Sequence, residues 1–335
     1  MNILKKVGLS ALAGSLVAVS ASAGELAVSG IWELTHKSDD NASQGNPYGS
    51  KSAIMFNGSG DIDGVGTATW YAAINDNNPA GFLSHQITID MGDMGEFGFD
   101  QGVGAYGGNT IDDKSPTAWE ESWHNTANSS GGFSANGGSS GVLGYKNTIS
   151  GINVNIEYAP QLGAADAGDG NTGGLTPATT LQSGSNTNWA ITSTALMDGL
   201  DVGFGYGKDS IGNDSTTSSE LESVVGYANY TIGSVKAGIT MSQSAGGTAG
   251  SGANHVTAYG IAVNISDDLS VSINQHDNDY MKAGGTNITQ ESTGIAIAYT
   301  MGGAKIAIQN NSMDNVAGVS GTNDEITEIS LSMAF

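Results

Sequence analysis

Residues 325–335, EITEISLSMAF, are the stretch of the sequence that decides its fold. Polar and apolar side chains alternate here, and successive side chains of an extended strand point to opposite faces. One face carries an apolar row that reaches the last residue: Thr327, Ile329, Leu331, Met333 and Phe335. The opposite face carries Glu328, Ser330, Ser332 and Ala334. Terminal residues of water-soluble proteins usually fray into solvent, so we expect the apolar row to face lipid.

The same alternation recurs in runs of about 9–11 residues, the length of a strand that crosses a bilayer at a tilt. The clearest are 152–158 (INVNIEY) and 269–276 (LSVSINQH). A β-sandwich also alternates in this way, so alternation alone leaves both architectures open. We find sixteen candidate strands: 25–35, 51–60, 64–75, 83–91, 95–101, 141–147, 151–158, 187–197, 199–207, 220–231, 233–243, 255–265, 269–277, 291–300, 303–311 and 325–335.

The lengths of the connections favour a barrel. Short links such as 61–63, 148–150, 266–268 and 301–302 alternate with long polar segments. The long segments are 36–50, 76–82, 102–140, 159–186, 208–219, 244–254, 278–290 and 312–324. Transmembrane barrels have short turns on one rim and long loops on the other, whereas a soluble sandwich has no reason for such regularity. We therefore predict an all-β fold, a sixteen-stranded antiparallel transmembrane β-barrel.

The first 23 residues have the features of a secretory signal peptide. Lys5 and Lys6 give a basic start, residues 7–19 form a short apolar run, and residues 21–23 (ASA) form an A-x-A cleavage site. No later segment approaches the roughly 20 apolar residues of a membrane-spanning helix. We predict a cleaved signal peptide at 1–23, a barrel domain at 24–335, and export to the cell outer membrane.

The composition excludes several classes of function. The chain has 33 acidic residues against 10 basic ones, none of them arginine, and a formal net charge of −23. Nucleic-acid binding needs a basic surface, so we expect no nucleic-acid partner. An acidic protein attracts cations, although the charge can also serve only to keep the exterior solvated. There is no cysteine, and therefore no disulfide framework or thiolate metal site.

Several stretches, taken in order with the sixteen strands, resemble the general porins of Gram-negative outer membranes. These stretches are 25–34, YGSKSAIMFNGSGD (48–61), GVGTATWYAAIND (64–76), MGEFGFDQG (94–102), VLGYKNTISGINVNIEY (142–158) and the terminal phenylalanine. The resemblance covers essentially all of the mature sequence, although no single stretch is diagnostic. It implies a homotrimer of water-filled barrels among outer-membrane lipid and lipopolysaccharide. It also implies that a long third loop folds into each lumen.

The third loop is 102–140, and thirty-nine residues without a strand pattern are uncommon and usually functional. Its middle, IDDKSPTAWEESWHN, also contains Trp119, Trp123 and His124. We predict that four acidic residues of this loop form the pore constriction: Asp112, Asp113, Glu120 and Glu121. The alternative is a solvent-exposed surface loop.

The resemblance also implies basic residues on the wall that faces the loop. Lys51 and Lys146 lie at matching places and fall on the polar face by alternation. Lys236 and Lys305 also face inward in this register. The wall arginines of the family are missing, and charges of one sign around a pore select against permeants of the same sign. The sequence therefore favours a pore that prefers cations.

Other motifs give weaker signals. Residues 102–107 (GVGAYG) satisfy G-x-G-x-x-G without a following helix. Residues 137–141 satisfy G-x-S-x-G without the strand–turn–helix that a nucleophile elbow needs. His85, His276 and Asp277 fall near predicted outer strand ends, as a rim hydrolase would require, but exposed histidines in polar loops are usually only solvated. We predict no enzyme activity.

We also expect no organic cofactor. Residues 166–171 (DAGDGN) offer oxygen ligands of the kind that Ca²⁺ takes, but they lack the EF-hand spacing. A divalent cation that bridges acidic loops stays open, with no assigned site.

These observations predict a porin, a water-filled diffusion channel for small hydrophilic solutes and ions. Two alternatives keep the barrel. One is a substrate-selective channel, in which Trp119 and Trp123 would stack on solutes, and the other is a non-conducting surface barrel or adhesin that uses loops such as 159–186. A soluble periplasmic or secreted β-sandwich is the remaining alternative.

Overall fold

The computed structural model describes residues 24–39, 45–76, 84–111, 113–123, 140–160, 183–211, 218–248, 253–281 and 285–335. Sixteen strands lie within these residues. They are β1 (Glu25–Asp39), β2 (Tyr48–Ile62), β3 (Gly66–Asn75), β4 (Ser84–Asp90), β5 (Glu96–Gln101), β6 (Ser140–Ile149), β7 (Ile152–Ala159), β8 (Ser183–Ser193), β9 (Leu200–Ile211), β10 (Ser218–Ile232), β11 (Val235–Thr248), β12 (Ala253–Asn264), β13 (Leu269–Met281), β14 (Ile288–Met301), β15 (Ala304–Asp314) and β16 (Asn323–Ala334). Three short 3₁₀ helices accompany them: η1 (Gly92–Met94), η2 (Gly107–Thr110) and η4 (Val316–Gly318). None of the helices in these ranges is long and apolar enough to cross a membrane.

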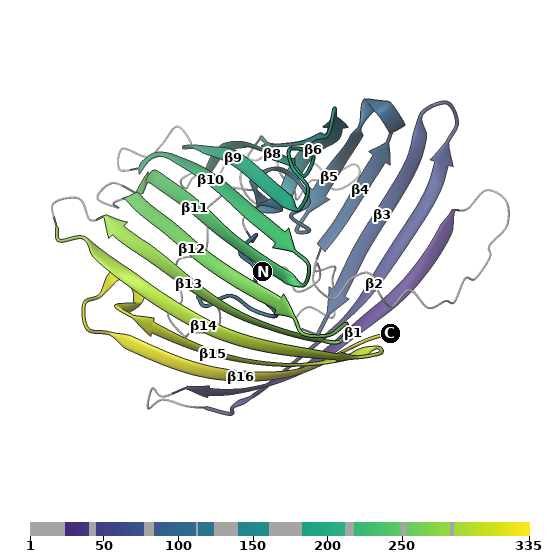
Figure 1. Ribbon diagram of the computed structural model, residues 1–335. Coiled ribbons are helices and arrows are strands. Elements are labelled where there is room, and N and C mark those ends of the chain that lie inside the picture. Colours follow the sequence, from purple (N-terminus) through teal and green to yellow (C-terminus); the bar gives the residue numbers. More distant parts are fainter. Residues whose placement is uncertain are drawn as a thin grey trace.

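The strands form one closed antiparallel barrel in which each strand pairs with its neighbours in sequence (Figure 1). The first and last strands close the ring, with Leu34 of β1 opposite Leu331 of β16. The last residue joins this ladder, since the Phe335 N–H donates to the Gly30 carbonyl at 2.8 Å and the Gly30 N–H donates back to Phe335 at 3.0 Å. Closure leaves no edge strand with unpaired backbone groups. The prediction of a sixteen-stranded antiparallel β-barrel is confirmed.

Large apolar side chains cover the outer face of the barrel. Ile261, Ile273 and Ile295 lie opposite one another on β12, β13 and β14, and each is about half exposed. The residues next to Ile273 in the chain, Ser272 and Asn274, point inward and are buried. A soluble protein rarely exposes so continuous an apolar surface, so this alternation suits a barrel with lipid outside and polar groups inside.

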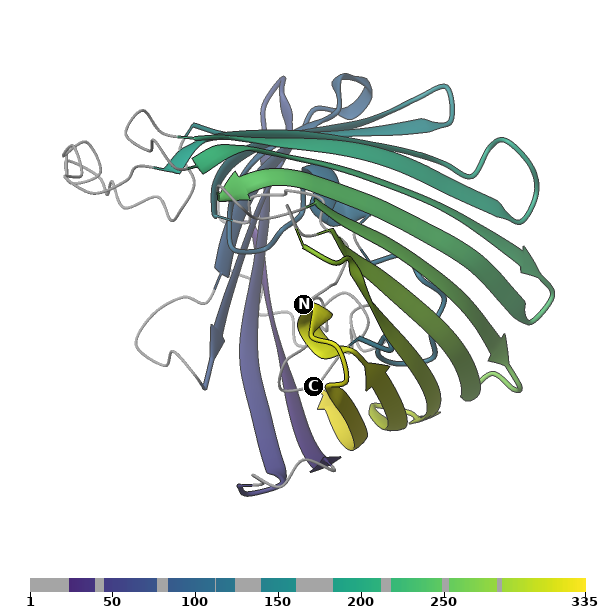
Figure 2. The ribbon, with the colours of Figure 1, turned by 90° about the vertical axis from the view of Figure 1, so that its left-hand side faces the viewer.

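Most strands extend beyond the predicted runs, and they end at short turns along one rim (Figure 2). The β6–β7 turn consists of Ser150 and Gly151, both with positive φ, so it lies later than the predicted link at 148–150. Two successive residues with positive φ are typical of the tight turns that match the twist of a hairpin. Such turns fix the register, and with it the face to which each side chain points.

Two adjacent residues of β2 test which face of the barrel meets lipid. Ile54 points outward and is 52 % exposed, while its neighbour Met55 points inward. We expect Ile54→Lys to lower the free energy of unfolding by about 2–4 kcal/mol, the cost of a lysine on the lipid face near the bilayer centre. Met55→Lys, at the same depth, is the matched control and should change it by less than about 1 kcal/mol, because its charge enters a polar interior. Urea unfolding of the barrel in lipid vesicles measures both, and equal losses would contradict the assignment of faces.

Candidate functional site

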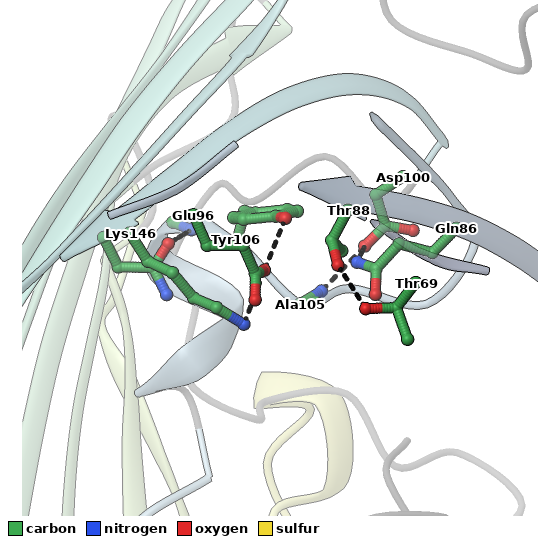
Figure 3. Close-up of polar contacts among 10 residues, drawn as sticks. Thr69, Gln86, Thr88, Glu96, Asp100, Ala105, Tyr106 and Lys146 are labelled. Atoms are coloured by element: carbon green, nitrogen blue, oxygen red, sulfur yellow. Dashed lines mark hydrogen bonds and ion pairs between the residues drawn. The ribbon is translucent and has the colours of Figure 1, made fainter. Parts of the chain in front are cut away.

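The chain turns inward directly after β5. The buried Asp100 carboxylate accepts hydrogen bonds from the Val103 N–H at 2.7 Å and the Ala105 N–H at 2.8 Å. The Gln86 side-chain amide of β4 donates a third at 3.3 Å (Figure 3). A buried carboxylate is stable only when such donors surround it. Asp100 therefore fixes the direction in which the following segment leaves the wall.

The next contact is the side chain of Tyr106, which is fully buried against the wall. Its ring lies where Gly98 and Gly144 have no side chain: a Cβ on Gly144 would come within 2.0 Å of the ring. The hydroxyl donates to Glu96 Oε1 at 3.0 Å (Figure 3). Burial, followed by the nearby Glu96 carboxylate, raises the pKa of Tyr106 above its ordinary value. Tyr106 therefore keeps its proton and remains a hydrogen-bond donor.

Beyond Tyr106, polar side chains of the inner wall bind the backbone of the segment. The Gly107 and Gly108 N–H groups donate to Asn155 and Asn188 on β7 and β8. The later wall contacts come from β10, β13 and β15. The side-chain amide of Asn229 donates to the Lys114 carbonyl at 2.8 Å, and those of Gln309 and Asn311 donate to the Glu121 carbonyl at 2.8 and 3.1 Å. In the other direction, the Ala118 N–H donates to the Ser272 hydroxyl and the Ser122 N–H donates to the Asn274 side-chain oxygen, both at 2.8 Å. The described part of the loop thus lies against the inner wall from β5 to β15. Its backbone groups, which lack strand partners, are paired by the wall instead.

Apolar side chains of the same segment pack into smooth patches of the wall. Ile111 is fully buried among small or apolar inward residues that include Ala190, Val225 and Ala258. Trp119 packs against an alanine patch on β14 and β15: Ala296, Ala298 and Ala307. The apolar side chains of the loop therefore pack at inward wall positions that carry small or apolar residues. Burial of Ile111 and Trp119 adds to the hydrogen bonds that hold the loop.

The four acidic residues predicted to form the constriction do not share one environment. Asp112 lies outside the described residues, and Asp113 is half-buried. Glu120 and Glu121 are each 6 % exposed. Glu120 lies within electrostatic range of Glu328 on β16.

The two predicted wall lysines both lie beside acids. Lys51 is directly opposite Glu33 in the β1–β2 ladder, on the inward face. The Lys146 ammonium lies 2.9 Å from Glu96 Oε1 and 5.6 Å from the centre of the Tyr106 ring (Figure 3). Each lysine therefore has an acid next to it on the wall itself, and not only on the loop.

The acids of the wall were not among the predicted site residues. Glu33 and Glu328 are buried inward residues on the two strands that close the barrel, and Lys37 lies 3.8 Å from Glu328. The alternation at 325–335 already separated Glu328 from the apolar row. Strand alternation alone gives no sign that the closing strands bring Glu33 and Glu328 together.

The expected position of one histidine side chain is wrong. His276 does not lie at an exposed rim; it is fully buried inside, with its ring 4.4 Å from the ring of Trp123. Trp119 is buried against its alanine patch, and the half-buried ring of Trp123 lies against His276. His276 shares the inward face of β13 with Ser272 and Asn274, and β13 extends to Met281, which takes residue 276 away from the end of its strand.

The described ranges contain no group of three or more His, Asp or Glu side chains that could hold a metal ion. The acidic run at 166–171 and the residue His124 lie outside these ranges.

Comparison with known structures places this architecture among outer-membrane proteins of sixteen strands. OmpF of Salmonella typhi, in complex with daunomycin, superposes with a TM-score of 0.66 at 13% identity, over 93% of this chain and 98% of that one. OmpT, an outer membrane protein of Vibrio cholerae, gives 0.65 at 11% identity over 96% and 100%. An anion-selective porin from Comamonas acidovorans gives 0.64 at 13% identity over 92% and 99%. No family model matches the chain, and no curated protein sequence matches it. At such low identities the likeness shows the fold: that of the general porins.

The packing of the Tyr106 ring against Gly144 provides a test of how the loop is held. Gly144→Ala places a methyl group inside the Tyr106 ring, so the ring must leave the wall. We expect hydrogen exchange at the Gly107 and Gly108 amides to become at least about tenfold faster, because displacing the ring weakens the adjacent bonds to Asn155 and Asn188. Gly226→Ala is the matched control: its Cβ would find ordinary contacts, the nearest at 3.6 Å. Unchanged exchange in both variants would show that Tyr106 does not hold the loop.

Proposed function

We propose that this protein is an outer-membrane diffusion channel. Small hydrophilic solutes and ions pass through the lumen without chemical reaction, and cations pass in preference to anions. The segment 102–140 narrows the lumen and sets the size limit.

The observation that carries this proposal is the position of residues 102–111 and 113–123 against the inner wall of a closed barrel. The barrel has an apolar exterior and a polar inner wall, and backbone amides of the segment bind that wall through Asn188, Ser272 and Asn274. A surface loop would make no such contacts. A segment held in this way occupies part of the cross-section, and pore diameter and the groups that line a pore govern what passes.

The balance of charge supports a preference for cations. Three carboxylates gather where β1 and β16 meet the loop, namely Glu33, Glu120 and Glu328, with Lys37 beside them. Acidic rings favour cations in channels. The likeness to a barrel described as an anion-selective porin means that this fold alone does not decide the sign, so the side chains must.

The site of action follows from the same features. We propose that residues 1–23 are removed on export and that residues 24–335 insert in the outer membrane. There the barrel contacts lipid and lipopolysaccharide through its apolar exterior, and three copies associate, as the resemblance to general porins implies.

Current recordings across a planar bilayer under a salt gradient test the function and its selectivity. We expect stable conductance steps with a reversal potential on the cation-selective side. Neutralising Asp112, Asp113, Glu120 and Glu121 together, as Asn or Gln, should move the reversal potential toward zero, because the charges that repel anions are removed.

The matched control neutralises four acids of the short turns: Asp63, Asp198, Asp267 and Asp268. These lie at a rim open to salt solution, where screening over about 8–10 Å weakens their effect. An equal shift in both quadruple variants would remove the loop acids from the constriction. A folded barrel without conductance would overturn the proposed function itself.

Shortening the loop tests its part in the size limit. Replacing residues 109–121 by a Gly-Gly-Ser linker should raise the single-channel conductance by about twofold or more and admit larger sugars in liposome swelling, because the cross-section widens. An equal deletion within 161–182, between β7 and β8, should alter neither property. Unchanged conductance after removal of 109–121 would place the limiting width elsewhere.

A further inference from the structure

A cavity of about 920 Å³ lies inside the barrel, between the seated loop and the short-turn ends of β4 to β10. Its charged and aromatic lining includes Lys114, Lys146, Asp90, Glu96, Asp201 and Tyr227, and threonine and asparagine side chains fill the spaces between them. This volume is within the range of small-molecule sites, about 300–1,000 Å³. The cavity is therefore large enough to hold a solute and not only to let it pass.

Lys114 is the cation of this cavity that the wall positions from two sides. Asn229 on β10 donates from its side-chain amide to the Lys114 carbonyl at 2.8 Å. The ammonium lies 5.9 Å from the centre of the Tyr227 ring, a distance at which an aromatic face attracts a cation. It makes no ion pair with a carboxylate of the described residues. Lys114 can therefore bind an anionic group of a solute.

The opposite charge lies at the other end of the same tyrosine. The Tyr227 hydroxyl donates to Asp201 Oδ1 at 2.8 Å, and Asp201 on β9 is directly opposite Asn229 in the ladder. A carboxylate accepts several hydrogen bonds, so Asp201 keeps capacity for a donor from the cavity. Tyr227 thus links one cation on the loop, through its ring face, and one anion on the wall, through its hydroxyl.

The remaining charges disfavour a solute that carries only a negative charge. Lys146 is matched by Glu96 at 2.9 Å (Figure 3), so it offers no second site for an anion. The lining acids Asp90, Asp93, Glu96 and Asp201 outnumber the two lysines, which disfavours an anion, while a simple cation gains no contact from Lys114. The Lys114 ammonium also covers a face of Tyr227, the ring on which a sugar would otherwise stack.

We propose that this cavity binds small zwitterions of the α-amino-acid kind, with the carboxylate on Lys114 and the ammonium on Asp201. The proposal rests on the proposed channel function and adds a saturable step to diffusion through it. Neutral solutes of the same size cross the pore without saturation.

Single-channel recordings with L-glutamine test this site. The ion current is measured first without solute, which establishes that the channel conducts, and then with rising concentrations of L-glutamine. We expect a saturable reduction of current. N-acetyl-L-glutamine lacks the ammonium and L-glutaminamide lacks the carboxylate, so neither should produce saturation at about pH 6, below the ordinary pKa of an α-amine.

Substitutions locate the site. Lys114→Gln and Asp201→Asn should each raise the half-saturating concentration of L-glutamine about tenfold or more, since each removes one charge-assisted bond. Lys236→Gln removes another inward lysine, on β11 and outside the cavity lining, and should leave half-saturation unchanged. A gel-mobility shift on heating confirms that every variant is folded.

The proposal is overturned if the wild-type current falls linearly with L-glutamine, or if saturation persists unchanged in both Lys114→Gln and Asp201→Asn. Either result leaves the conductance measured without solute intact, and so separates failure of the binding site from failure of the channel.

Discussion

The constraint on which the structure depends is that lipid offers no hydrogen bonds. Every backbone N–H and C=O in the hydrocarbon layer must find a partner within the protein, and a sheet meets this requirement only when it closes. Closure here is completed by the pairing of β1 with β16 and by the reciprocal bonds between Gly30 and Phe335. Once the ring is closed, the strand period of two separates an apolar exterior from a polar interior. The interior is then free to carry function.

The need to pair every backbone N–H and C=O group also shapes the interior of the barrel. The segment after β5 has no strand partner, so its backbone groups are paired by side chains of the wall, such as Asn188 and Asn274. Where the wall instead offers glycine or alanine, as at Gly144 and Ala298, ring side chains of the loop fill the space. The pattern of inward residues therefore does more than line a pore with polar groups. It specifies where the loop lies and which loop charges face the remaining open space.

The features of this fold that the sequence predicts are those that follow from local periodicity. Alternation predicted the sixteen strands, and it assigned Lys51 and Lys146 to the inward face because each strand residue has only two faces to choose from. The loop has no such period, so neither the burial of Trp119 against alanines nor the position of Lys114 over Tyr227 was predictable. His276 was misplaced for a related reason, since strand ends depend on pairing with neighbours and not on the residue pattern alone. Glu33 and Glu328 come together only through closure, a contact between the two ends of the chain.

The lysines of the interior explain why so acidic a lumen is compatible with a stable barrel. Lys146 pairs with Glu96, and Lys37 lies beside Glu328. Each cation thus offsets an acid on an adjacent strand, where removal from water would otherwise make an isolated charge costly. Pairing of this kind cancels charge locally, and the proposed preference for cations rests on the acids left over. Lys114 differs because its ammonium lies over an aromatic ring and not against a carboxylate. In the proposed cation-preferring pore, Lys114 is the proposed place for an anionic group, and a solute that carries both charges can bind there.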